Sequence, residues 1–191
     1  MIERSSIPES ELPESYRKVL SFFFSFPMQS PSLNDLAGVI KSSKTAVKMA
    51  VSRLIKEGFL KKEVVGKTWR ISADPKSPLL ITRKIPYNLG LIYRSDIVRR
   101  VYERIPEARA IILFGSYRWG TDNEKSDIDI GIEILGDRAL HIEPLLTLDF
   151  LGFRKKVKVN LHIFSRSNLD LNLFTNIANG IVLDGLLEVR P

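Results

Sequence analysis

The sequence lacks cysteine altogether and has only two histidines in 191 residues. Without thiols the chain can form neither a disulfide framework nor a thiolate metal site, which fits a reducing, cytoplasmic location. It also lacks an apolar segment of membrane-spanning length. The aromatic run from Phe22 to Phe26 is short and follows Arg17 and Lys18 within a helical pattern, so it predicts core packing and not a signal sequence. We therefore expect no membrane partner.

The remaining composition is ordinary for a globular protein, with 44% apolar and 27% charged residues and no internal repeat. The length accommodates one large domain or two small ones. Charge is distributed unevenly. Residues 41–70 hold nine Lys or Arg against two Glu, a balance of +7 that equals the net charge of the whole chain. Residues 81–191 carry sixteen basic and fourteen acidic side chains, so the basic excess is local to the first part of the sequence.

The basic segment lies within a pattern of three helices and a hairpin. Apolar spacing predicts helices over residues 15–26, 32–40 and 43–57, with Ser32 and Ser43 as N-caps and Gly58 ending the third. Two strands, predicted over 59–65 and 67–72, follow and meet near Gly66.

This order of elements over residues 14–73 resembles the winged helix-turn-helix fold of the MarR and ArsR regulator families. In those families the third helix enters the major groove of DNA, and the hairpin wing touches the backbone or minor groove. The alternative is a protein-binding winged helix with a solvated basic surface, and Trp69 is interpreted as a packing residue of the wing. The resemblance implies DNA as a partner, with groove-facing and phosphate-contacting candidates at Lys44, Thr45, Lys48, Met49, Lys61, Lys62, Lys67 and Arg70.

The second part of the chain is predicted to be a separate α/β domain. Residues 74–90 contain Pro75, Pro78 and Pro86 without a clear period, which predicts a linker or an irregular brace between domains 1–73 and 91–191. The segment 140–153 is apolar but interrupted, so it is open between a cover for the sheet and a dimer surface. Elements predicted beyond the linker are a helix from an N-cap at Ser95 to Ile105, strands over 110–114 and 157–164, a helix over 168–179, and a hairpin turn at Asp184-Gly185.

The strongest functional signal is a pair of aspartates, Asp127 and Asp129, separated by one isoleucine. In an extended strand alternate side chains share a face, so both acids point to one side while the isoleucines fill the other. The carboxylates would lie about 7 Å apart. Such a pair repels itself unless a cation lies between, and hard oxygen ligands suit Mg²⁺ with bound phosphates.

A Gly-Ser turn supplies the second half of this predicted site. The apolar strand over 110–114 ends at Gly115 and Ser116, and one helical turn can follow. Backbone amides at such a turn attract phosphate oxygens, glycine lets a ligand approach closely, and the Ser116 hydroxyl adds a donor. Triphosphate and metal are therefore expected to meet between adjacent strands.

The Leu113-Phe114-Gly115-Ser116 turn, followed by Ser126-Asp127-Ile128-Asp129-Ile130, resembles the nucleotidyltransferase superfamily that includes DNA polymerase beta, especially its minimal members. Members transfer a nucleoside monophosphate (NMP) from a nucleoside triphosphate (NTP) to a hydroxyl. The resemblance implies that Gly115 and Ser116 bind the nucleotide, and that Asp127 and Asp129 are catalytic and hold Mg²⁺ or Mn²⁺. The plainer interpretation is an amphipathic strand after a tight turn, which any α/β protein can carry.

The sequence departs from that family at the third catalytic position. The family places a third carboxylate on the next strand, and Asn160 stands in the matching place here. A neutral amide cannot accept a proton, so a large part of the transition-state stabilisation would be lost. Glu133, further along the face of Asp129, and His162, on the face of Asn160, are the residues that could compensate, although each is more often a solvated strand residue.

These observations predict an α/β (α+β) protein with an N-terminal winged helix-turn-helix domain followed by a small mixed-sheet nucleotidyltransferase-like domain. The leading hypothesis is metal-dependent NMP transfer guided by DNA binding. The alternative is a DNA-binding transcriptional regulator whose transferase domain has lost its chemistry. A third hypothesis is a nucleotidylating antitoxin with a small helical HEPN-domain toxin as partner, and a homodimer is expected because winged helices often bind two-fold sites.

Overall fold

A computed structural model describes residues 12–188, so the ends of the two predicted domains, 1–11 and 189–191, lie outside it. The chain divides into two compact units, residues 1–80 and 81–191. Across the described residues, no helix has both the length and the apolar character that crossing a bilayer requires. Each unit is considered by itself.

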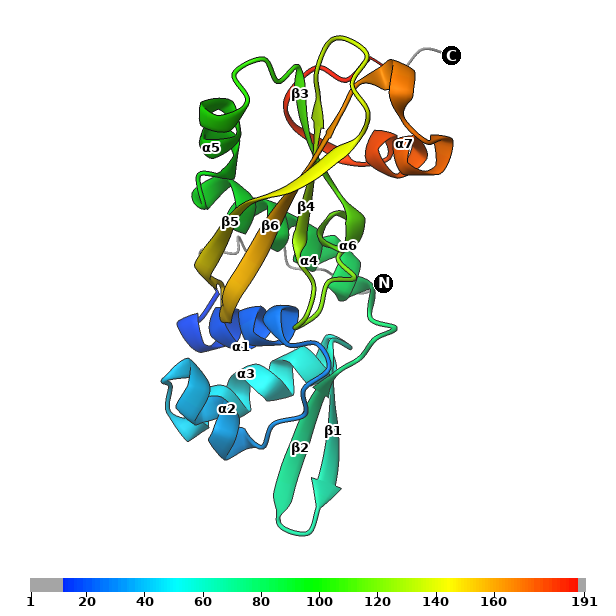
Figure 1. Cartoon of the computed structure of the whole chain (residues 1–191). Coiled ribbons are helices and arrows are strands. Elements are labelled where there is room, and N and C mark those ends of the chain that lie inside the picture. Colours follow the sequence, from blue (N-terminus) through cyan, green and yellow to red (C-terminus); the bar gives the residue numbers. More distant parts are fainter. Residues whose placement is uncertain (1–11, 189–191) are drawn as a thin grey trace. The chain divides into compact units, whose positions relative to one another are not determined.

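From residue 12, where the described part begins, the first unit forms three helices and then an antiparallel hairpin, in the predicted order (Figure 1). Ser32 begins α2 with a capping box, in which its hydroxyl accepts the Asp35 amide N–H while the Asp35 carboxylate accepts the Ser32 amide. Ser43 caps α3 by accepting from the Ala46 amide. Both predicted N-caps are therefore confirmed. The elements are α1 (Glu14–Ser25), α2 (Leu33–Ile40), α3 (Lys44–Lys56), β1 (Leu60–Val65) and β2 (Thr68–Ala73).

Aromatic side chains of α1 form much of the core of this unit. Phe22, Phe23 and Phe24 are buried, and the rings of Phe24 and Phe59 meet edge to face with centroids 5.5 Å apart. The run of phenylalanines is thus core, as predicted.

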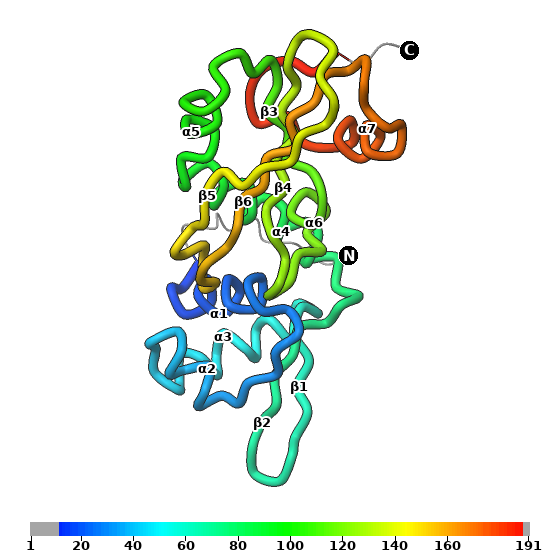
Figure 2. The backbone as a smooth tube through the Cα atoms, viewed as in Figure 1, coloured from blue at the N-terminus to red at the C-terminus, as the bar shows by residue number. Residues whose placement is uncertain are grey.

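The second unit is built on a five-stranded mixed sheet with the order β5-β6-β4-β3-β7. β4 and β6 are parallel, whereas the other neighbouring pairs are antiparallel, and the trace in Figure 2 shows β5 turning back into β6. Its elements are α4 (Pro78–Arg94), α5 (Ile97–Arg104), β3 (Ala110–Phe114), α6 (Gly115–Trp119), β4 (Ile128–Glu133), β5 (His141–Leu151), β6 (Arg154–Phe164), the 3-10 helix η2 (Arg166–Asn168), α7 (Leu171–Ala178) and β7 (Ile181–Gly185).

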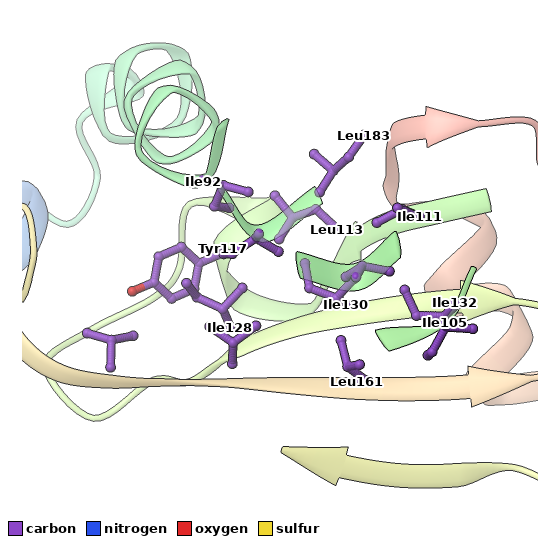
Figure 3. Packing of buried hydrophobic residues seen from close by; sticks show 14 of the residues in the cluster. Ile92, Ile105, Ile111, Leu113, Tyr117, Ile128, Ile130, Ile132, Leu161 and Leu183 are labelled. Carbon is purple, nitrogen blue, oxygen red and sulfur yellow. The ribbon is translucent and has the colours of Figure 1, made fainter. Parts of the chain in front are cut away.

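The two faces of the sheet are covered by different helices. One face packs against α4 and α5 through the main cluster of buried side chains, which Figure 3 shows around Ile128, Ile130 and Ile132. The other face packs against α7 through a smaller cluster that includes Phe114 and Ile177. Side chains of β3 alternate between these clusters, whereas the isoleucines of β4 all belong to the first. On its other face β4 presents Gly131 to Ile177 of α7, so the face that carries the acids is the one beneath α7.

Several local predictions need correction. The predicted linker over 74–90 is wrong from Pro78 onward, because residues 78–94 form α4 with Pro86 inside it. Ser95 does not cap α5. Its hydroxyl donates to the Ile92 carbonyl at the end of α4, and the N-cap is Asp96. Segment 140–153 is mostly the edge strand β5, and Asp184-Gly185 ends β7 where a hairpin turn was predicted.

Candidate functional site

The acid pair lies at the start of β4, beside the end of β3 and the middle of β6. Asp129 lies in β4 between Phe114 of β3 and Asn160 of β6 in the sheet register. Asp127 directly precedes β4 and, two residues earlier, shares the face of Asp129. Both acids are half-buried, whereas Ile128 between them is fully buried on the opposite face.

The Gly-Ser turn passes directly against Asp129, the second acid of this pair. Gly115 has a φ of +67°, and a Cβ built on it would lie 2.9 Å from Oδ2 of Asp129. A side chain at this position would be strained by the backbone conformation and would also displace the carboxylate. Ser116 follows in the first turn of α6, half-buried. The structure therefore brings together the turn and the acids that the sequence predicted to meet.

Asn160 and His162 complete the group from β6. The Asn160 side-chain amide, Nδ2, lies 3.4 Å from Oδ2 of Asp127. Nε2 of His162 lies 3.2 Å from Oδ1 of Asp129, and its ring meets Phe114 edge to face at 4.9 Å between centroids. An amide donor thus faces the first aspartate and an imidazole faces the second.

Glu133, one of the two residues considered as compensation for Asn160, lies outside this group. Although it shares the face of Asp129, it is four residues further along β4, a distance of about 13 Å in a strand. Its carboxylate is buried, and Oε1 pairs with Nη2 of Arg166 at 2.6 Å. The expectation that Glu133 could compensate for Asn160 is therefore wrong. Of the two residues considered, His162 is the one that lies beside the acid pair.

The residues present fit a divalent cation that also binds phosphate. Among residues 12–188, no three His, Cys, Asp or Glu side chains are arranged to hold a metal ion together. Mg²⁺, however, commonly takes only one or two protein carboxylates and completes its shell with water and substrate phosphates. Asp127 and Asp129 match that smaller donor set, and both carboxylates are half-buried beside the Gly-Ser turn.

Sequence reasoning missed a second layer of residues behind the acid pair. These residues are buried polar side chains that hold the loop between α6 and β4, and only their polar character within apolar surroundings could have signalled them. Two of them lie in the segment that was taken for a linker. The four residues of this second layer are Lys84, Asn88, Asp122 and Arg154.

The predicted nucleic-acid residues of the first unit all have exposed side chains. Lys44, Lys48 and Met49 lie on the outer face of α3, opposite its buried residues Val47, Val51 and Leu54. Trp69 is half-buried on β2, with the Lys62 ammonium 4.2 Å and the Lys48 ammonium 5.6 Å from its ring centroid. The remaining exposed candidates are Thr45, Lys61, Lys62, Lys67 and Arg70.

Comparison with known proteins gives a family match that covers the site. Residues 94–168 match the family model described as a nucleotidyltransferase domain. This range includes β3, the Gly-Ser turn, β4 and β6, and hence both aspartates and Asn160. No curated protein matches the chain. The matched range lies within the second unit, and the first unit lies outside it.

Proposed function

We propose that the protein transfers NMP from an NTP to a hydroxyl acceptor, and that its first unit is a DNA-binding winged helix. The observation that supports the transfer is the close packing of Gly115 against Asp129, where a Cβ built on the glycine would lie 2.9 Å from Oδ2, since it joins a turn suited to phosphates with a carboxylate suited to metal. The nucleotidyltransferase match over residues 94–168 supports it independently.

In the proposed reaction the acceptor oxygen forms a bond to the α-phosphorus, and the bond to pyrophosphate breaks. Asp127 and Asp129 would hold Mg²⁺ or Mn²⁺, which lowers the charge on the phosphates. Gly115 would give the triphosphate a close path along the backbone, and the Ser116 hydroxyl would donate to a phosphate oxygen. His162 would hold Asp129 in one orientation through its Nε2 contact.

Asn160 favours a second candidate, a DNA-binding regulator whose transferase site no longer performs chemistry. An amide beside Asp127 cannot take the acceptor proton. Losing a general base of this kind commonly costs about 10²-fold to 10⁴-fold in rate. The two candidates therefore differ in whether the wild-type protein turns over NTP at all.

The experiment measures pyrophosphate release and label transfer from α-labelled ATP, CTP, GTP and UTP with Mg²⁺ or Mn²⁺. Activity in the wild type that is lost in Asp127→Ala supports the transferase. If Asn160→Asp transfers label at least about 100-fold faster than a nearly inactive wild type, the result supports a site that has lost its base. Asp149→Asn is the matched control, because Asp149 is an exposed acid of β5 and its loss should change nothing. Absence of activity in every variant would contradict the transfer.

DNA binding by the first unit is tested separately. We expect Lys44→Ala/Lys48→Ala to weaken binding to duplex DNA about tenfold or more, because both ammonium groups lie on the exposed face of α3. Fluorescence anisotropy with labelled DNA measures the change. The control, Arg100→Ala/Lys155→Ala, removes the same charge from exposed positions of the second unit. Equal losses in both variants would show a general charge effect and contradict a specific surface on α3.

A further inference from the structure

The loop that leads to the acid pair is held by buried charged groups. Residues 120–127 connect α6 to β4, and Asp122 in this loop is only 3% exposed. Lys84 of α4, which pairs with it, is 1% exposed, and Arg154 at the start of β6 is 7% exposed. Groups of this kind are rarely buried unless each finds partners.

The first part of the network joins α4 to the loop and to α6. Nζ of Lys84 lies 3.2 Å from Oδ2 of Asp122 and also donates to the Asp122 backbone carbonyl. The Asn88 amide, one turn further along α4, donates to Oδ1 of Asp122 at 2.7 Å and to the Tyr117 carbonyl at 3.2 Å. The α4 helix therefore binds the helix after the Gly-Ser turn and the loop before the aspartates at once.

The second part fixes the end of the same loop. The Arg154 guanidinium donates to the carbonyls of Glu124 at 3.2 Å and Ser126 at 2.6 Å, and also to the Tyr117 hydroxyl. Ser126 is the residue directly before Asp127. Three acceptors from two segments thus converge on one side chain at the start of β6.

Stability alone is a weak reason for such an arrangement. Burial lowers the pKa of Lys84 and raises the pKa of Asp122, which shows that both charged forms lose hydration in the fold. Apolar residues of similar volume often replace a buried ion pair without loss of stability. What apolar residues cannot supply is directional bonds to specific carbonyl groups of the loop.

We propose that Lys84, Asn88, Asp122 and Arg154 are positioning residues that set the acid pair against the Gly-Ser turn. They act through the backbone of residues 117–126, and none of them needs to touch a ligand. The inference rests on the proposed function for what the acid pair binds, but the positioning itself can be measured without any ligand.

The decisive variant is Lys84→Met/Asp122→Leu, measured in the full chain. We expect it to keep the thermal midpoint of the wild type within a few degrees. Amide hydrogen exchange over residues 120–129 should become about tenfold faster or more, and Mn²⁺ affinity, measured by electron paramagnetic resonance, should fall about tenfold. Mn²⁺ binding is assigned to the acid pair by its loss in Asp127→Ala.

The matched control is Glu133→Leu/Arg166→Met, which removes the ion pair between the buried Glu133 and the half-buried Arg166 at the other end of β4. It should leave exchange over 120–129 and Mn²⁺ affinity unchanged.

Unchanged exchange in a folded Lys84→Met/Asp122→Leu protein would overturn the proposal. If the double variant does not fold, Arg154→Lys decides, because lysine keeps the charge but not the fork of donors. Faster amide exchange over residues 120–129 in Arg154→Lys supports the positioning role, and exchange at the wild-type rate refutes it. A wild type that binds no Mn²⁺ would count against the proposed function, while the exchange result would still judge the network.

Discussion

At the scale of single residues, Gly115 is the position with the least freedom to change. Its positive φ and the 2.9 Å separation between a built Cβ and Asp129 Oδ2 are independent obstacles to any side chain. We expect Gly115→Ala to destabilise the protein by about 1–3 kcal/mol and to displace the Asp129 carboxylate. Urea unfolding measures the first effect. Gly90→Ala is the control.

The control differs in backbone conformation and in what surrounds it. Gly90 lies within α4, where a Cβ would meet only the flexible end of Arg94 at 3.1 Å. Alanine there should be neutral or stabilising by up to about 1 kcal/mol. If Gly115→Ala were as stable as Gly90→Ala, the close packing of the turn against Asp129 would be wrong.

The sequence predicted the residues of the site better than it predicted their neighbours. Asp127, Asp129, Gly115 and Asn160 were located because strand periodicity and a glycine turn are local signals. Glu133 was misjudged because sharing a face does not mean sharing an end of the strand. Its partner, Arg166, lies beyond the following β6 and comes near only through the sheet.

At the scale of elements, the capping box of α2 links helix stability to pH. The hydroxyl and amide of Ser32 both donate to the Asp35 carboxylate and hold its pKa below the usual value of about 3.9. A lowered pKa in the folded state adds stability that is present above the unfolded pKa and is lost as pH falls through the folded pKa. We expect Ser32→Ala to raise the pKa of Asp35, as measured by NMR titration of its carboxyl carbon.

Asp74 provides the internal reference for that titration. The Lys76 amide is the first cause of its lowered pKa, with Lys61 second, and Ser32 takes no part in either contact. Its pKa should therefore be the same in Ser32→Ala and the wild type. If the pKa values of Asp35 and Asp74 shifted together, the change would reflect a general loss of structure and not the loss of the Ser32 cap.

The element that the sequence failed to predict is α4. Three prolines between residues 75 and 86 are a strong local signal against a helix. Tertiary contacts outweigh it, because α4 buries Ile92 in the main cluster and supplies Lys84 and Asn88 to the loop network. Pro78 also stands at the first position of the helix, where a missing N–H costs nothing. The starts of α2 and α3 could be predicted because their capping serines are adjacent in sequence, whereas α5 was given the wrong N-cap.

At the scale of the whole molecule, the concentration of charge leads to a prediction about salt. Six of the candidate DNA contacts are Lys or Arg with exposed side chains, at positions 44, 48, 61, 62, 67 and 70. If each neutralises one phosphate, the logarithm of the DNA association constant should fall with the logarithm of salt concentration with a slope of about −5. Lys44→Ala/Lys48→Ala should reduce the magnitude of that slope by about 2. A slope near zero in anisotropy titrations would contradict DNA binding through this surface.

The pairing of β3 with β7 has a consequence for the order in which a nascent chain acquires its parts. β3 ends at the Gly-Ser turn, yet its outer partner is β7, which is synthesised some seventy residues later. The first 80 residues can become compact while the sheet still lacks a strand. A ribosome-bound chain would therefore expose its basic hairpin well before β3, which ends at the Gly-Ser turn, had both of its neighbouring strands.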